Sequence, residues 1–412
     1  MKTFKSILKK TLPILMIIGP GIISGSVDND AGGIATYSVA GANFGYSLLW
    51  VLFLTTFALA LTQEIGARLG LVTGKGLAAL IREKFGIKWT TFIMAVLLIA
   101  NLGTIAAEFA GIAAALQIIN IPKFISIPVA ILAVYLIIIK GSFKKLEKIF
   151  LMLSAFYIVY IISAFMAKPD WLLGAKSLIM PTFSISKGYF LALIATVGTT
   201  ITPWGQFFIQ DYVVDKKLTQ SDLKVERGDV FVGSFLTNFI SFFIIVACAA
   251  TIYATHQSIT DAAGAAQALR PLAGNFAALL FSFGLLNASL FGAALVPIST
   301  SYVLTEAFGF ESGLDFSFKE APAFYGIFTL LLIICGIFVL LPIFPLLTIL
   351  IVSQAFNAIL LVPILFFIFI LSNDKKLLGE YKNSRFVNII LIITLSLLAI
   401  TSLIYLGTLF WG

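Results

Sequence analysis

The chain has 412 residues, of which 60% are hydrophobic and only 11% are charged. Its apolar residues come in long runs, each able to cross about 30 Å of hydrocarbon, separated by short charged segments. Short alternating segments, which are typical of a membrane β-barrel, do not dominate the pattern. The composition therefore excludes a soluble globular protein and predicts an all-α membrane protein.

Eleven apolar runs are expected to span the membrane. They lie near 12–41, 46–69, 89–117, 124–140, 147–167, 188–214, 230–254, 275–307, 322–341, 345–372 and 386–410. The first run contains acids and has no small-residue cleavage site, so we expect a retained span rather than a signal peptide.

The distribution of Lys and Arg predicts the orientation of these spans. With an internal N-terminus, the inner segments hold 22 of the 27 basic residues. By the positive-inside rule we expect a multi-pass protein of the cell membrane with a cytoplasmic N-terminus and an external C-terminus. The net charge of +8 reflects this bias and does not indicate nucleic-acid binding.

Two spans are interrupted at corresponding positions. The first breaks at GSVDNDAGG, residues 25–33, and the sixth breaks at TTITPWGQ, residues 199–206. Five spans separate the starts of these two broken helices, and because five crossings are an odd number, a second copy of a five-helix repeat must enter from the opposite side. Interrupted helices at matching positions of two inverted halves point to the central site of a transporter. We expect a single transmembrane domain over 1–412, with a first repeat over 12–167, a second over 188–372 and an extra helix over 386–410.

The first break brings two acids to membrane depth. Asp28 and Asp30 would lie on opposite faces of an intact helix, and Gly32 and Gly33 favour unwinding. An unwound segment can turn a carboxylate and backbone carbonyls toward a cation, and unpaired carbonyls are tolerated there only where they line a cavity. The alternative is a short external loop, which would leave 12–27 as a span too short for a membrane.

The second break follows from Pro203, which removes a backbone donor, and Gly205, which loosens the next turn. A break at Thr202 is expected, with Thr199 on the same face and Gln206 beyond it. The alternative is a simple proline kink whose hydroxyl groups bond to backbone carbonyls.

Other spans carry polar stripes, which often only hold membrane helices together. An ionisable residue inside a span is by default a functional candidate, and this singles out Glu108. Glu64, four residues before Arg68, is expected to form a local ion pair. The stripes are Asn101, Thr104 and Glu108 in the third span, Ser234, Asn238 and Ser241 in the seventh, and Gln354 and Asn357 in the tenth.

The donors at the two breaks are all oxygen atoms, and neither break contains Met, Cys or His. Oxygen ligands suit Mg²⁺, Ca²⁺ or Mn²⁺, and a site with few charges suits an ion that keeps several waters, as Mg²⁺ does. The sequence predicts a hard divalent cation as substrate and the lipid bilayer as surroundings. No cofactor motif or nucleophile–base set is found, so neither a cofactor nor an enzymatic activity is expected.

At these residues the chain resembles the natural resistance-associated macrophage protein (Nramp) family of divalent metal transporters. The resemblance covers most of the chain and implies a leucine-transporter-like fold, with two inverted five-helix repeats and a metal site between the broken first and sixth helices. It rests on GPG at 19–21, DAGGIAT at 30–36, GYSLLWV at 45–51, LIRE at 80–83 and AEF at 107–109.

Departures from the family pattern concern the metal site. The family's Asp-Pro-Gly-Asn reads DAGG here, which matches Asp30 to the metal-binding aspartate and puts Gly33 at the asparagine. The family's Met-Pro-His reads TPW, which puts Thr202 at the methionine and Trp204 at the histidine.

The third span loses a further titratable group. Glu108 matches a glutamate that the family retains, but Ile105 stands where an acid implicated in proton movement is often found. Together these changes resemble the Nramp-related magnesium transporters, thought to bind a hydrated ion without proton coupling.

We therefore expect an uncoupled carrier of Mg²⁺, and also of Mn²⁺, that works by alternating access. The alternatives left open are a proton-coupled importer of Mn²⁺ or Fe²⁺, an organic-solute symporter on the same fold, and a metal-gated receptor or channel. The expected metal-site residues are Asp30, Gly33, Thr199, Thr202 and Gly205. The expected water-holding or gating residues are Asp28, Glu108, Trp204, Gln206, Gln354 and Asn357.

Overall fold

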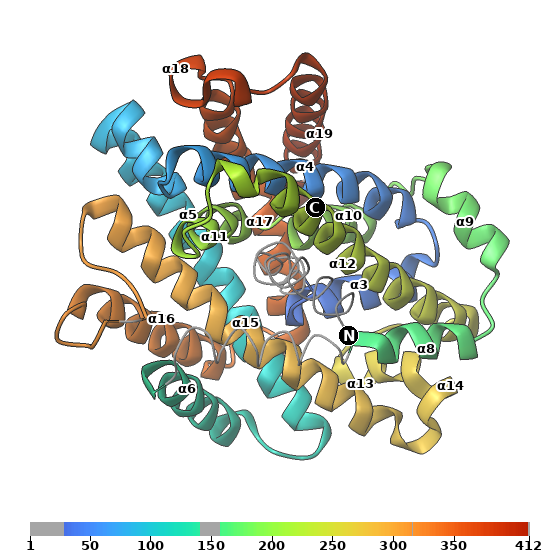
Figure 1. Cartoon of the computed structure of the whole chain (residues 1–412). Helices are drawn as coiled ribbons and strands as arrows, with labels where there is room; N and C mark the ends of the chain where they lie inside the picture. The colour runs from blue at the N-terminus through green and yellow to red at the C-terminus, as the bar shows by residue number, and fades with distance from the viewer. Residues whose placement is uncertain (1–28, 141–156, 315, 411–412) are drawn as a thin grey trace, which may run out of the picture.

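The computed structural model describes residues 29–140, 157–314 and 316–410, and these form helices joined by short connections (Figure 1). Asp28, the first part of the first predicted span and residues 147–156 of the fifth lie outside the described residues. The longer helices are α3 (Ala31–Phe44), α4 (Leu49–Thr73), α5 (Leu77–Ile118), α6 (Lys123–Lys140), α8 (Ile158–Met166), α9 (Trp171–Ile179), α10 (Lys187–Thr200), α11 (Pro203–Asp215), α12 (Leu223–Thr251), α15 (Ala277–Phe308), α16 (Pro322–Leu340), α17 (Leu346–Ser372) and α19 (Arg385–Phe410).

Apolar spans account for most of this structure. Within the described residues, 8 helical segments are long and apolar enough to cross a membrane. They coincide with the second to fourth and the seventh to eleventh predicted runs. The sixth run is divided into α10 and α11, as the break at Thr202 predicts, while α3 and α8 are the described parts of the first and fifth. The prediction of an all-α protein with several apolar spans is confirmed.

Helix α5 begins earlier than the predicted third span. Residues 77–85, expected to belong to an inner connection, are helical, and Gly86 (φ 79°) turns the chain into the span proper. Leu77, Leu80 and Ile81 are buried, so this short segment is held by its own apolar face. A positive φ of this size favours glycine.

The interior is formed around α5, which packs against α15 and α17. Helix α3 contacts α12, α10 and α17, and every residue from Ala31 to Ala42 is buried. The first break therefore leads into the centre of the molecule rather than to its surface.

Helices α6, α16 and α19 lie at the periphery. Their outer faces expose large apolar side chains such as Leu132, Leu330 and Leu403, as expected of helices that face lipid. Helix α18 (Lys375–Leu378) and the start of α19 lie at one end of the molecule, with the short helices α13 (Ala262–Ala265) and α14 (Arg270–Ala273) at the opposite end (Figure 1).

Candidate metal site

Asp30 is the residue at which helix α3 starts. Its backbone is extended (φ −65°, ψ −173°), and Oδ1 accepts a hydrogen bond of 2.7 Å from the amide of Gly33. The residue is 1% exposed, and its second oxygen, Oδ2, is buried without a hydrogen-bond donor. Burying such an oxygen is costly unless a cation or a proton accompanies it. One carboxylate oxygen thus caps the helix while the other is available to a cation.

Thr202 has the corresponding position in the second break. It caps α11 with a hydrogen bond of 3.3 Å from the amide of Gly205 to its Oγ1. Helix α10 ends at Thr200, and because Pro203 has no N–H, the carbonyl of Thr199 has no helical donor four residues on. The hydroxyl of Thr199 is also buried without a partner. The C-terminal end of a helix carries partial negative charge, so this end of α10 favours a cation.

Gln354 of α17 contacts the first break and the last turn of α10, directly before the second break. A Cβ added at Gly32 would lie 1.8 Å from Gln354 Nε2, and one at Gly198 would lie 1.9 Å from the Gln354 carbonyl oxygen. Only glycine allows these approaches. Asn357 donates hydrogen bonds of 2.9 Å to Gln354 Oε1 and to Thr104 Oγ1. Gln354 Nε2 has no acceptor and, as a donor, cannot bind a cation. A water on a cation donates its own protons, so Oε1, which accepts only one of its two possible hydrogen bonds from the described residues, is the atom of Gln354 that can hold such a water.

Glu108 of α5 lies beside Asp30. Its Oε2 accepts a hydrogen bond of 3.4 Å from the amide of Ala31, its Oε1 has no donor, and it interacts electrostatically with Asp30. The residue is fully buried. Two buried like charges repel one another, so the pair requires a cation or a proton.

The remaining predicted site residues lie on the first turns of the half-helices. Gly33 and Gly205 are each the third residue of their helix, and their amides are used by the caps. Trp204 and Gln206 are fully buried, and neither the indole N–H nor the side-chain amide of Gln206 has a partner. An indole can only donate, so Trp204 cannot replace a histidine as a ligand, whereas Gln206 offers an amide oxygen.

Sequence reasoning missed Asn29, which holds the first break in place. Its amide nitrogen donates to the carbonyl and the hydroxyl of Thr237, both at 3.0 Å, and its oxygen accepts a 2.8 Å hydrogen bond from Ser241. Its carbonyl accepts a 2.8 Å hydrogen bond from Tyr157. The polar stripe of the seventh span was the available signal, because Ser241 belongs to it.

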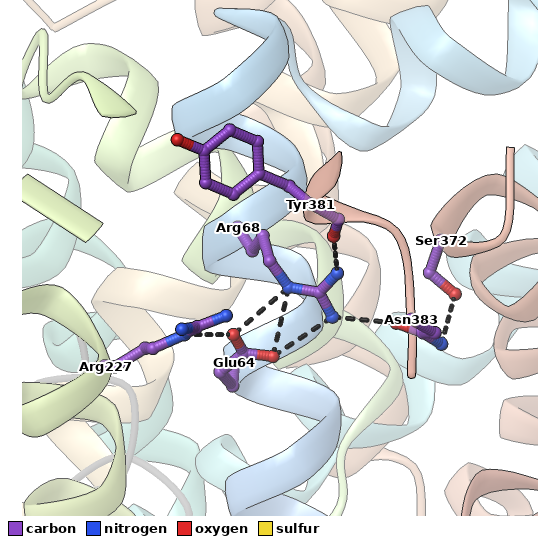
Figure 2. A network of polar contacts seen from close by, with 6 residues as sticks. All are labelled: Glu64, Arg68, Arg227, Ser372, Tyr381 and Asn383. Atoms are coloured by element: carbon purple, nitrogen blue, oxygen red, sulfur yellow. Dashed lines mark hydrogen bonds and ion pairs between the residues drawn. The ribbon is translucent and has the colours of Figure 1, made fainter. Parts of the chain in front are cut away.

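The predicted ion pair between Glu64 and Arg68 is confirmed and is part of a larger network (Figure 2). Arg68 Nε lies 3.1 Å from Glu64 Oε1, and Arg227 of α12 reaches the same oxygen at 2.6 Å. Arg68 also donates to Asn383 Oδ1 at 2.7 Å and to the carbonyl of Tyr381. The network joins α4 and α12 to the connection between α17 and α19 and shares no residue with the two breaks.

The chemistry of the site is that of oxygen ligands. Among the residues that the structure describes, no three His, Cys, Asp or Glu side chains come together. Among the described side chains, a cation beside Asp30 can therefore draw on the carboxylates of Asp30 and Glu108, completed by neutral oxygens or waters. Such a set suits Mg²⁺ or Mn²⁺ better than softer metals.

Comparison with known proteins assigns the chain to a family. The profile of natural resistance-associated macrophage protein-like (Nramp) proteins matches residues 21–408. The chain belongs to the Nramp family. This Nramp protein is similar to the divalent metal cation transporter MntH of Vibrio campbellii, with 28% identity over 95% of this chain and 92% of that protein. It is also similar to MntH of Klebsiella pneumoniae subsp. pneumoniae, with 27% identity over 90% of this chain and 89% of that protein. Nramp proteins are transporters, so the prediction that the chain is not an enzyme is confirmed.

Solved structures confirm the leucine-transporter-like fold of this Nramp protein. The Eremococcus coleocola manganese transporter, bound to an aromatic bis-isothiourea compound, matches with a TM-score of 0.80 at 21% identity, over 96% of this chain and 87% of that one. MhsT in complex with L-phenylalanine matches with a TM-score of 0.59 at 16% identity, over 94% and 97%. At these identities the likeness concerns the fold alone.

Proposed function

We propose that this Nramp protein carries divalent metal cations across the membrane by alternating access around the two breaks. The observation that carries the proposal is Asp30 Oδ2, a buried carboxylate oxygen without a donor. It belongs to the first break, and Gln354 packs closely against Gly32 in that break and against Gly198, the residue before the second break. The names of the MntH relatives and of the manganese transporter support a divalent metal as the substrate.

In this proposal Asp30 is the charged ligand, and the carbonyl and hydroxyl of Thr199 approach the ion from α10. Thr202 shapes the cavity by capping α11, together with the first turns at Gly33 and Gly205. Gln354 holds a hydrating water, and Gln206 supplies a further oxygen. A divalent cation moving inward gains about 4.6 kcal/mol per 100 mV of inside-negative potential, twice the single-charge value.

The finer proposal concerns ion preference. The relatives' names favour Mn²⁺, and the oxygen-only donor set supports acceptance of Mg²⁺ as well, since neither break offers a soft ligand. Uptake of Mn²⁺ into proteoliposomes, measured with Mg²⁺, Ca²⁺ and Cd²⁺ as competitors, tests this preference. Competition by Mg²⁺ that matches or exceeds that of Cd²⁺ supports a hard site, whereas strong inhibition by Cd²⁺ alone overturns it.

A second candidate is proton-coupled import of Mn²⁺ or Fe²⁺. The printed names of the similar proteins, a divalent metal cation transporter and a manganese transporter, favour a transition metal over Mg²⁺. One observation supports coupling: Glu108 lies beside Asp30, and such a pair can hold a proton when no cation is present. Against it, the single histidine of the chain, His256, follows the short 3₁₀ turn after α12 and is exposed.

A pH-sensitive dye inside the proteoliposomes distinguishes the two mechanisms. The uncoupled carrier leaves the internal pH unchanged during metal uptake, whereas acidification that requires the metal establishes coupling.

The orientation proposed for the chain places the basic ends of the helices in the cytosol, with the C-terminus outside. It is supported by the 22 of 27 Lys and Arg residues that fall on one side of the predicted spans. Labelling of a cysteine introduced after α19 by a membrane-impermeant reagent in whole cells tests this orientation.

A further inference from the structure

A pocket of about 570 Å³ opens beside the Glu64–Arg68–Arg227 network, between α4, α12 and the start of α19. Its polar end is formed by these three residues and by Glu380 and Lys382. The pocket lies at the end of the molecule that also carries α18, and none of its lining residues belongs to the two breaks.

The two arginines of the pocket are not equally satisfied. Arg68 is 3% exposed and donates to Glu64, Asn383 and the carbonyl of Tyr381 (Figure 2). Arg227 is 48% exposed and bonds through Nε to the same carboxylate of Glu64. Because a guanidinium has five N–H donors, Arg227 retains donors for a further partner.

The charges of the lining favour an anion. Two arginines share the single carboxylate of Glu64, which leaves one positive charge in excess. The charges of Lys382 and Glu380 cancel, so the five charged residues of the lining have a net charge of +1. Arg pairs with phosphate through parallel N–H···O bonds, which makes a phosphate group the best-matched anion.

The lining becomes apolar in one direction along all three helices. Leu61 precedes Glu64 by one turn in α4, Phe231 follows Arg227 by one turn in α12, and Val387 lies in the first turn of α19. Phe231 is 42% exposed. The charged end and the apolar end are therefore stacked along the helix axes, as the headgroup and the acyl chains of a phospholipid are stacked along the membrane normal.

We propose that this pocket binds an anionic phospholipid, with its phosphate on Arg227 and Lys382 and its acyl chains against Leu61, Phe231 and Val387. Basic pockets between membrane helices on the cytoplasmic side bind acidic headgroups in this way. A free phosphate would use only the charged end, and the apolar end selects the lipid. The site is separate from the metal site and does not depend on which ion is transported.

The full-length protein in a neutral detergent provides the test. Its thermal unfolding midpoint is followed while phosphatidylglycerol, phosphatidylcholine or inorganic phosphate is titrated in. We expect phosphatidylglycerol alone to raise the midpoint. In Arg227→Gln the apparent affinity falls about tenfold, as expected for the loss of a charge-assisted contact, and in Lys382→Gln it falls about fivefold.

The matched control is Arg270→Gln, an exposed arginine of α14 at the opposite end of the molecule, which should keep the affinity of the unmodified protein. Lys382 lies outside the network of Figure 2, so its variant remains informative if Arg227→Gln unfolds. The proposal is overturned if Lys382→Gln binds phosphatidylglycerol as tightly as Arg270→Gln does. It is also overturned if phosphatidylcholine or inorganic phosphate stabilises the protein equally.

Discussion

Replacing Gly198 by alanine tests the contact of Gln354 with the last turn of α10, directly before the second break. The added Cβ would lie 1.9 Å from the carbonyl oxygen of Gln354 and 2.7 Å from the amide nitrogen of Ala358. Both atoms belong to the backbone of α17, so no side chain can swing away, and α10 must move by on the order of 1.5 Å to restore ordinary contact. Overpacking of this kind costs about 1–3 kcal/mol, and the backbone clash puts Gly198→Ala at the upper end of that range.

The matched control for this variant is Gly326→Ala in α16, where a Cβ meets no atom within 4 Å. Alanine is the better helix former there, so the control should be neutral or more stable by up to about 1 kcal/mol. Thermal unfolding of the detergent-purified proteins should show a loss of roughly 3–4 °C for Gly198→Ala alone, accompanied by loss of metal uptake. Equal midpoints for the two variants would refute the close packing of α10 against Gln354.

Three further substitutions test other parts of the structure. Asn29→Ala removes the hydrogen bonds to α12 and should lower the free energy of unfolding by about 1–3 kcal/mol. The control is Thr401→Ala, whose hydroxyl donates to carbonyls of its own helix α19, and it should leave stability unchanged in the same unfolding assay. Glu64→Gln leaves two arginines without their shared carboxylate and should destabilise the protein by about 3–5 kcal/mol. The control is Glu83→Gln in an exposed ion pair, which should change stability by less than about 1 kcal/mol. Similar losses of stability in the two variants would contradict a stabilising role of the network. Glu108→Gln removes the charge beside Asp30, so Mn²⁺ uptake should fall and any metal-driven acidification inside the proteoliposomes should disappear. An unchanged rate of Mn²⁺ uptake together with an unchanged internal pH signal would exclude a role for this glutamate.

The positions of the breaks could be predicted because their causes are local. A proline has no amide hydrogen whatever its surroundings, so Pro203 interrupts the helical hydrogen bonds by itself. Asp30, with Gly32 and Gly33 shortly after it, favours a helix start over a continuous helix. The structure has helices starting directly after Asp30 and Thr202, each capped by that residue. The ion pair of Glu64 with Arg68 could be predicted for the same reason, since the two residues are four apart on one helix.

The partners across helices could not be predicted in this way. Asn29 and Ser241 are 212 residues apart, and Arg227 and Glu64 are separated by 163, so no local pattern connects them. The close approach of Gln354 to Gly32 and Gly198 depends on how three helices pack. A glycine in a membrane helix is consistent with a break, a kink or close packing, and only the packed structure distinguishes these roles.

The sequence shows which ligand groups stand at the two breaks, but it does not show which side chains from other helices join them. Hydroxyl, amide and carboxylate groups at both breaks indicated a hard cation, and the structure adds that Glu108 lies beside Asp30. It also buries Trp204 without an acceptor for its indole N–H, and an indole nitrogen, which is only a donor, offers no lone pair to an ion.

Metal uptake by Asp30→Asn tests the central claim most directly. Asparagine caps helices as well as aspartate does, so the hydrogen bond to Gly33 is preserved and the protein should remain folded, with an unfolding midpoint close to that of the unmodified chain. Only the charge on the site is removed. Since losing even a partner of a metal ligand costs about 10- to 100-fold, initial Mn²⁺ uptake into proteoliposomes at subsaturating metal should fall by about 100-fold or more. Uptake by the folded variant at the rate of the unmodified protein would contradict the assignment of Asp30 as the ligand that binds the transported cation.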